Sequence, residues 1–252
     1  MAKPTVILVG ADKGGVGKTT IARALLDYFD SNNMSPRAFD TEWPRGTLKR
    51  FHPIATEIVD VTAVPDQMKI FDTLGNPEAR VTVIDVRAGL LSSTLQALSD
   101  IGFLDSAKKG QTTFAVFHIL GPSIASLEEI AEMSHFVGNA NYFVVKNFIN
   151  NATFFEWDPA TYNSYFKKLK DAEEITVPKL NEMACEQVEI AGVPFVSFID
   201  NKTGEGGAAN NSFVLRGYVR HWLDQVWSEF DRVKMLDLVA PKQEKSARQA
   251  AG

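Results

Sequence analysis

The sequence predicts an α/β protein with an open, mostly parallel sheet of about seven strands and helices on both faces. Short runs rich in β-branched and aromatic residues alternate with longer segments whose apolar residues recur three and four positions apart. A length of 252 residues suits one such sheet as a single domain. Hydrophobic residues at 45% and charged residues at 23% are ordinary globular usage, which argues against a disordered or fibrous chain.

Seven segments are expected to be strands because each is short, apolar and bounded by turn-forming residues. Helical segments between them favour parallel pairing, since a crossover must carry the chain back before the next parallel strand begins. The expected strands are Thr5–Gly10, Arg37–Asp40, Glu57–Val61, Val81–Asp85, Thr112–Leu120, Tyr142–Phe148 and Val193–Ile199.

Three segments have the apolar spacing of amphipathic helices, whose apolar faces would cover the sheet. The first carries Ile21, Leu25 and Phe29, the second Ile124, Leu127, Ile130, Ala131 and Ser134, and the third Leu215, Val219, Leu223, Val226, Phe230 and Val233.

Residues 1–239 are expected to form one domain. Within them residues 150–187 are less regular, with a turn at Asp158–Pro159 and a basic helix over Tyr162–Ala172, and this region is a candidate insertion on the rim of the sheet. The polar, alanine-rich residues 240–252 are expected to be a disordered tail.

Composition excludes several classes of function. A net charge of −5 argues against a protein that coats nucleic acid by bulk charge. The single cysteine, Cys185, excludes an intrachain disulfide and a cysteine-rich metal site within one chain. The histidines His52, His118, His135 and His221 follow no metal-ligand spacing, so core or surface roles are expected. No stretch approaches the ~18 apolar residues of a membrane span, so a soluble, cytoplasmic chain without membrane insertion is expected.

The strongest motif is the run D-K-G-G-V-G-K-T-T at Asp12–Thr20, between the first expected strand and the first expected helix. Glycines let successive main-chain N–H groups turn toward one centre, and the N-terminus of the helix adds partial positive charge, so the loop suits phosphate oxygens. Lys18 would reach the β- and γ-phosphates, and the Thr19 hydroxyl would ligate Mg²⁺. The expected nucleotide-binding residues here are Gly14, Gly15, Val16, Gly17, Lys18, Thr19 and Thr20.

The stretch K-G-G-V-G-K-T-T resembles the deviant Walker A motif of the ParA/MinD family of P-loop ATPases. The resemblance implies the P-loop NTPase fold of the SIMIBI class, ATP and Mg²⁺ as ligands, and a homodimer that forms around two nucleotides. In that family the extra lysine, here Lys13, acts on the nucleotide of the partner subunit; the alternative is a solvated lysine beside a bound anion. The general phosphate-loop pattern has glycine where this chain has Asp12.

Two further segments look like parts of the same site. Asp85 ends a strand and is followed by V-R-A-G, similar to the family's Walker B and switch II pattern, with Arg87 in place of the usual proline. A carboxylate at this edge of a parallel sheet suits a Mg²⁺ ligand, and Gly89 would offer a main-chain N–H to the γ-phosphate. The alternative for Asp85 is a structural turn at the end of the strand.

Asp40 also ends a strand and begins D-T-E-W-P-R-G, which looks like the family's switch I. The resemblance implies that Asp40 holds a Mg²⁺-bound water and that Glu42 positions the attacking water. Glu42 is one methylene longer than the family's aspartate, and Trp43 is inserted before Pro44, so slow hydrolysis is expected. An ordinary acidic turn is the alternative for both carboxylates.

Asn147 lies at the end of the sixth expected strand, where members of the family often read adenine. Its amide can both donate and accept a hydrogen bond, as the edge of adenine requires, while a structural turn asparagine is the competing interpretation. The chain has no Asn-Lys-x-Asp or Thr-Lys-x-Asp guanine signature, which favours ATP.

These features together predict a ParA-like ATPase switch that binds Mg-ATP, dimerises around it and resets by hydrolysis, in plasmid or DNA partition, cargo positioning or conjugation. An activating protein partner is expected, because such switches need a trigger. The alternatives are an ATP-dependent small-molecule ligase of the dethiobiotin synthetase type and a nucleotide-binding regulator that has lost hydrolysis. Non-specific DNA is a further candidate partner through surface cations, which are Lys167, Lys168, Lys170, Arg216 and Arg220.

Overall fold

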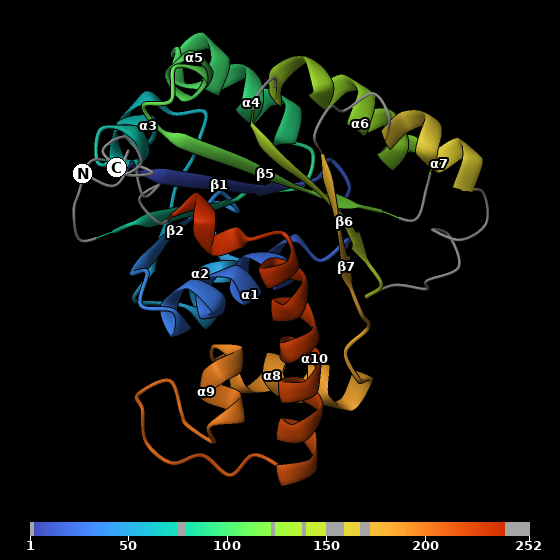
Figure 1. Cartoon of the computed structure of the whole chain (residues 1–252). Coiled ribbons are helices and arrows are strands. Elements are labelled where there is room, and N and C mark those ends of the chain that lie inside the picture. Colours follow the sequence, from blue (N-terminus) through green and yellow to red (C-terminus); the bar gives the residue numbers. More distant parts are fainter. Residues whose placement is uncertain are drawn as a thin grey trace, which may run out of the picture.

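The structure is a computed structural model, and it describes residues 3–74, 79–121, 124–137, 140–149, 159–166 and 172–239. Its centre is a seven-stranded sheet with the order β3-β2-β4-β1-β5-β6-β7, in which all neighbours are parallel (Figure 1). The strands are β1 (Thr5–Gly10), β2 (Pro36–Asp40), β3 (Thr56–Ile58), β4 (Val81–Asp85), β5 (Thr113–Leu120), β6 (Asn141–Asn147) and β7 (Glu173–Val177).

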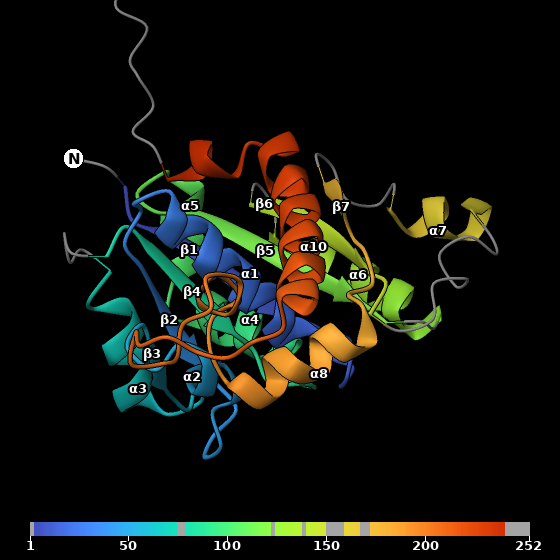
Figure 2. The same cartoon turned by 90° about the horizontal axis from the view of Figure 1, so that it is seen from below.

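Helices cover both faces of the sheet, as the sequence predicts (Figure 1). One face carries α3 (Val64–Phe71), α4 (Leu91–Asp100), α5 (Phe103–Lys108), α6 (Ile124–Val137) and α7 (Pro159–Phe166). The other carries α1 (Lys18–Ser31), α2 (Thr47–Phe51), α8 (Glu182–Ala191), α9 (Phe195–Ile199) and α10 (Phe213–Arg232), with α1 and α10 side by side in Figure 2.

The central strands divide their side chains between two cores. In β1, Ile7 and Val9 pack with the face that α1 and α10 cover, whereas Val6 and Leu8 pack with the face that α4 and α6 cover. Successive residues of a strand point to opposite faces, so a strand buried on both sides is apolar at every position. Burial on both faces therefore explains why the sequence of β1 contains one continuous apolar run.

Two expectations for the C-terminal half are wrong. Val193–Ile199 is not a strand, because Phe195–Ile199 forms the helix α9, which begins after Pro194 and buries Phe195, Phe198 and Ile199. The seventh strand is instead β7, which lies within residues 150–187, the candidate insertion on the rim of the sheet. In β7 only Ile175 and Val177 are buried, since it lies at the edge of the sheet.

The other expected strands and helices are confirmed with small shifts at their ends, except that β3 ends at Ile58 and not at Val61. The sequence does not predict the shorter helices α2 to α5 and α8. Of the expected basic helix over Tyr162–Ala172, residues 162–166 lie in α7 and Ala172 is not helical. Residues 150–158, 167–171 and the tail 240–252 lie outside the described residues. No helix in the described part of the chain is long and apolar enough to cross a membrane.

Chain direction creates a crevice at the carboxyl ends of β1 and β4. From β1 the chain enters α1 on one face of the sheet, and from the neighbouring β4 it enters α4 on the other. Segments that leave adjacent parallel strands toward opposite faces leave space between them, and open α/β sheets bind ligands there. The residues expected to hold a nucleotide lie at this edge.

Candidate nucleotide site

The loop between β1 and α1 has the backbone that its glycines predict. Gly15 and Gly17 have φ angles of +73° and +90°, and Gly17 is the residue from which α1 starts at Lys18. Left-handed conformations of this kind favour glycine because other residues meet steric strain there. The unpaired N–H groups of the first turn of α1 therefore face the crevice together with the positive end of the helix dipole.

Lys18 lies over this loop. Its ammonium group donates a hydrogen bond of 2.8 Å to the main-chain carbonyl of Lys13. Burial lowers the pKa of Lys18, while the nearby carboxylates of Asp85, Asp12, Glu129 and Glu42 act in the opposite direction. A cation held partly out of water beside free main-chain donors is suited to an anionic ligand.

Thr19 and Asp85 are in direct contact. The hydroxyl of Thr19 donates to a carboxylate oxygen of Asp85 over 2.7 Å. The pKa of Asp85 is raised to about 7, chiefly by burial and also by nearby Asp40, against the opposing effects of the bond from Thr19 and the charge of Lys18. A hydroxyl beside a carboxylate is an oxygen donor set of the kind that Mg²⁺ prefers, so these two side chains fit the metal that a nucleotide would bring.

Asp40 lies beside Asp85, since the two residues are partners in the register of β2 and β4. One carboxylate oxygen of Asp40 accepts from the N–H of Glu42 at 2.9 Å, and the other accepts from the N–H groups of Leu48 and Lys49 at 2.7 and 3.3 Å. Asp40 therefore holds its own loop and the start of α2. Its expected contact with a Mg²⁺-bound water stays a prediction.

Glu42 projects to the same cavity and accepts a hydrogen bond from the Thr47 hydroxyl. Trp43, which follows it, is 59% exposed. Thr41 connects this loop with the segment after β4: its N–H donates to the carbonyl of Asp85 at 3.0 Å, and its hydroxyl accepts from the N–H of Arg87 at 2.8 Å. The two expected switch segments are thus hydrogen-bonded to each other.

A cavity of about 430 Å³ collects most of the expected residues. Its wall consists of Gly14, Gly15, the segment from Gly17 to Thr20, the carboxylates Asp40, Glu42 and Asp85, and Thr47, Val86, Arg87, Ala88 and Ile149. Four expected site residues, Lys13, Val16, Gly89 and Asn147, are not on this wall. Gly89 lies just beyond Ala88 and has a φ angle of +78°.

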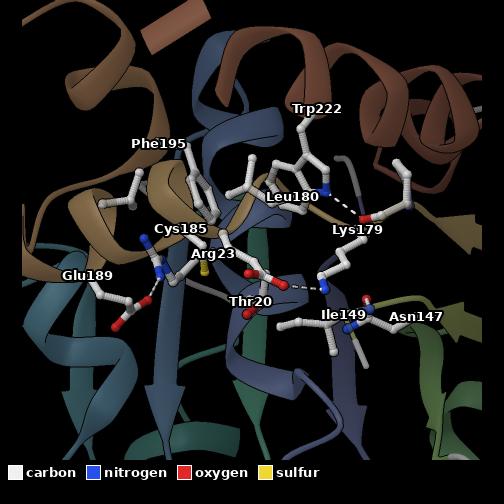
Figure 3. A pocket seen from close by; sticks show the side chains of 13 residues that line it. Thr20, Arg23, Asn147, Ile149, Lys179, Leu180, Cys185, Glu189, Phe195 and Trp222 are labelled. Carbon is white, nitrogen blue, oxygen red and sulfur yellow. Dashed lines mark hydrogen bonds and ion pairs between the residues drawn. The ribbon is translucent and has the colours of Figure 1, made fainter. Parts of the chain in front are cut away.

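Asn147 supports the phosphate loop from behind. Its amide nitrogen donates to the carbonyl of Val16 at 2.9 Å, and its amide oxygen accepts from the N–H of Ile149 at 3.2 Å. Asn147 also lines a second pocket of about 110 Å³, which shares Thr20 and Ile149 with the larger cavity. Figure 3 shows this pocket between α1, α8 and α10, with an apolar lining that includes Leu180, Phe195 and Trp222.

Lys13 does not line the cavity beside its own loop. Its side chain reaches the carboxyl end of β5, where its Cδ would lie 3.3 Å from a Cβ built on Gly121. The carboxylate of Glu129 is close enough for Lys13 to help lower its pKa, although burial is the largest influence and opposes this shift. A lysine that does not line its own phosphate cavity is compatible with action on another subunit.

The sequence does not predict two structural roles of residues near the phosphate loop. The carboxylate of Asp12 accepts from the N–H of Leu91 and the hydroxyl of Ser92, each at 3.1 Å, so it caps α4. No local pattern signals this contact, because the capped helix begins 79 positions later. Asp12 therefore ties the phosphate loop to the helix that follows Asp85.

The second role belongs to a buried chain of polar side chains. Glu129 accepts from the N–H of Asp12 at 3.3 Å and lies 3.1 Å from Nε2 of His118, whose Nδ1 lies 2.6 Å from the Tyr142 hydroxyl. His118 is completely buried, so the expected core role is confirmed for this histidine. A lone histidine in an apolar strand gives no sign of its partners.

Comparisons with known proteins give similar structures of low sequence identity. A nucleotide-binding protein in complex with ADP from Archaeoglobus fulgidus is 14% identical, with a TM-score of 0.50 over 74% of this chain and 86% of that one. The MinD cell division protein of Aquifex aeolicus is 14% identical, with a TM-score of 0.54 over 87% and 97%. A ParA family ATPase from Chlorobium tepidum is 11% identical, with a TM-score of 0.52 over 88% and 98%.

No model of a known protein family matches the chain, and no curated protein sequence matches it either. The structural likeness extends over most of both chains. This chain therefore has the fold of the MinD and ParA ATPases.

Proposed function

We propose that this chain binds Mg-ATP in the 430 Å³ cavity and hydrolyses it. The observation that carries the proposal is the placement of Lys18, Thr19 and Asp85 on one wall at the N-terminus of α1, with Thr19 and Asp85 joined by a 2.7 Å hydrogen bond. Main-chain N–H groups and Lys18 would hold the phosphates. Thr19 and Asp85 would hold Mg²⁺, which neutralises phosphate charge when bound, and Asp40 would hold one of its waters.

The second pocket supplies a place for the base. It adjoins the phosphate cavity through Thr20 and Ile149, and its lining is largely apolar, which suits the faces of an adenine ring. Asn147 lines this pocket while its amide holds Val16, so it would position the loop and contact the adenine edge at once. Asn147 would thus couple occupation of the base pocket to the phosphate loop.

ATP binding would also bring two chains together. Lys13 does not line the cavity of its own chain, and a second chain placed against this edge would receive it near its γ-phosphate. Glu42 would orient the attacking water, and Gly89 would approach the γ-phosphate through its main-chain N–H once the segment after Asp85 closes. Hydrolysis would then release the dimer.

A switch of this kind needs a partner that triggers it and a cargo. MinD of Aquifex aeolicus has been solved in complex with MinC, a protein partner. We propose an activating protein partner here too, a cytoplasmic location, and a role in plasmid or DNA partition, cargo positioning or conjugation. The named similar structures are a nucleotide-binding protein and MinD and ParA ATPases, and they do not favour the ligase alternative.

DNA is the less supported of the proposed partners. Arg220 is exposed on α10, but Arg216 is half-buried and donates to the carbonyl of Ile199 at 3.1 Å. The lysines expected in the same patch, Lys167, Lys168 and Lys170, lie outside the described residues. A DNA-shift titration with and without ATP tests this partner, and no ATP-dependent shift at low ionic strength would remove it.

The activity is tested by phosphate release from Mg-ATP. The parent chain should release phosphate slowly, and the Lys18→Ala variant should release none above background. Dethiobiotin-type substrates should not change the rate. A rate that depends strictly on an added carboxylic acid substrate would support the ligase instead.

A further inference from the structure

Arg87 occupies a position that the nucleotide-binding role described above does not use. It stands two residues after Asp85, where the resembled switch II pattern has proline, and it lies on the wall of the 430 Å³ cavity. Among the described residues that form this wall, Lys18 and Arg87 are the positively charged ones, facing the carboxylates of Asp40, Glu42 and Asp85. An arginine here adds a cation to a wall that is otherwise rich in carboxylates.

The guanidinium group of Arg87 is available to a ligand. The side chain is exposed, and it makes no hydrogen bond or ion pair with the residues that the structure describes. The hydrogen bonds of Arg87 to the described residues are made by its main chain: its N–H donates to the Thr41 hydroxyl at 2.8 Å, and its carbonyl accepts from the N–H of Leu90 at 3.1 Å. The backbone is therefore fixed while the charged end has no competing partner in the described chain.

Two contacts place the segment that carries Arg87 beside Asp85 and the start of the phosphate loop. The N–H of Val86 donates to the carbonyl of Val9 at 2.8 Å, so the segment after β4 runs alongside the start of the phosphate loop. The side chain of Ala88 lies 3.8 Å from a Cβ built on Gly14. Arg87 therefore stands between Asp85 and a residue that lies beside Gly14, whereas Ile149, which also lines the second pocket, lies 3.5 Å from a Cβ built on Gly17.

We propose that Arg87 is a catalytic residue that contacts the terminal phosphate of the nucleotide bound in its own chain; this rests on the proposed ATPase function. In hydrolysis, water adds to the γ-phosphorus, and the bond from phosphorus to the bridging oxygen breaks with its electron pair staying on ADP. One proton of the water is released to solvent, and the other stays on the inorganic phosphate that forms. Arg87 forms no covalent bond and transfers no proton, but its guanidinium donates hydrogen bonds to the γ-phosphoryl oxygens.

This role follows from the shape of the guanidinium group. Its planar N–H groups match two phosphoryl oxygens at once, and charge on these oxygens changes during transfer. The Thr41 contact fixes the main chain of Arg87 beside the cavity, and a guanidinium held on the phosphate from there would stabilise that charge. The same contact would let Arg87 distinguish ATP from ADP, which lacks the phosphate it reaches.

The test compares the parent chain with Arg87→Ala and Arg87→Lys. Arg80→Ala is the matched control. Arg80 immediately precedes β4, so this variant removes the same charge at the amino end of the strand, whereas Arg87 follows its carboxyl end. Two readouts are measured: single-turnover ATP hydrolysis, and equilibrium affinities for Mg-ADP and for a non-hydrolysable ATP analogue. Since the side chain is exposed and its main-chain bond is retained, the variants should fold.

Arg87→Ala should slow hydrolysis about 100-fold, as expected for loss of one positioned charged donor. It should weaken binding of the ATP analogue by roughly tenfold and leave Mg-ADP affinity within about twofold. Arg87→Lys should fall between, because lysine keeps the charge but not the paired donors. Arg80→Ala should match the parent in both readouts.

The proposal is overturned if Arg87→Ala keeps both the parent's hydrolysis rate and its preference for the ATP analogue over ADP. Mixing the Arg87→Ala chain with excess Lys18→Ala chain tests the assignment to the same chain, since a rescued rate would mean that Arg87 acts on a partner's nucleotide. A parent chain that binds neither nucleotide contradicts the proposed ATPase function itself, and the role of Arg87 falls with it. If the parent chain binds ATP but hydrolyses it too slowly to measure, the ratio of its affinities for the ATP analogue and for Mg-ADP still tests the role of Arg87.

Discussion

Gly17 offers a sharp test of how the phosphate loop is held. It is the N-cap of α1 with a φ angle of +90°, and a Cβ built on it lies 2.2 Å from the amide nitrogen of Asn147. That nitrogen is buried and donates to Val16. Gly17→Ala must therefore strain the backbone and also displace Asn147 from its hydrogen bond.

The two costs can be separated. A left-handed conformation costs an alanine about 1 to 2 kcal/mol relative to glycine. Displacing Asn147 leaves buried polar groups without partners at a cost of about 1 to 3 kcal/mol. The free energy of unfolding should therefore fall by about 2 to 5 kcal/mol, which for a chain of this size lowers Tm by roughly 4 to 20 °C.

Gly15→Ala is the control, because Gly15 also has a positive φ, of +73°, but a Cβ there has nothing within 4 Å. It should carry only the backbone cost of about 1 to 2 kcal/mol. Urea denaturation and thermal melting of both variants measure the difference. Asn147→Ala should make the Gly17→Ala change less costly, since the clashing side chain is gone. Equal destabilisation by Gly15→Ala and Gly17→Ala, with no coupling to Asn147, would refute the assignment of Asn147 as the support of the loop.

Two further predictions concern Lys13 and Asp27. Lys13→Ala should leave nucleotide binding by the isolated chain unchanged but weaken ATP-dependent dimers, because this lysine does not line its own cavity; light scattering with and without Mg-ATP measures the dimer, and undiminished dimers would contradict the role. Asp27 is buried on α1 and accepts from the N–H of Phe195 at 2.8 Å, and burial raises its pKa to about 7, with Arg23 opposing. Between pH 4 and 7 the folded chain therefore binds a proton at Asp27 that the unfolded chain does not bind. As pH rises through this window, the free energy of unfolding of the parent should fall relative to that of Asp27→Asn, by up to about 1.4 kcal/mol per pH unit. Urea midpoints at pH 5 and 7.5 check this, and a difference between the two proteins that does not change with pH would contradict it.

The sequence was most informative where chemistry depends on adjacent residues. Gly14 to Thr20 form one turn between a strand and a helix, so spacing alone predicts their meeting. Asp40 and Asp85 end neighbouring parallel strands, and the carboxyl ends of such strands share one edge of the sheet. That rule brings together residues that are far apart in the chain.

The sequence was least informative where contacts join distant elements. The capping of α4 by Asp12 depends on a helix that begins at Leu91, and the contact of Glu129 with Asp12 depends on how α6 packs. Nothing in the residues beside Asp12 encodes either geometry. These partners follow from tertiary packing, which periodicity does not specify.

The mistaken seventh strand has a related cause. Val193–Ile199 is a short apolar run, and such a run is compatible with a buried strand or with a buried helical turn. Here Pro194 is the N-cap of a helix that begins at Phe195, and the buried residues Phe195, Phe198 and Ile199 are spaced by one helical turn. The true edge strand β7 buries only Ile175 and Val177, so its apolar signal is weak.

The central claim is that the loop bearing Lys18 holds the phosphates of ATP. Calorimetric titration of Mg-ATP into the parent chain and into Lys18→Ala tests it most directly. The account predicts saturable binding of one ATP per parent chain and at least a 100-fold loss of affinity, about 2.7 kcal/mol, in the variant. Equal affinity in the two proteins, or no binding by the parent chain, would contradict it.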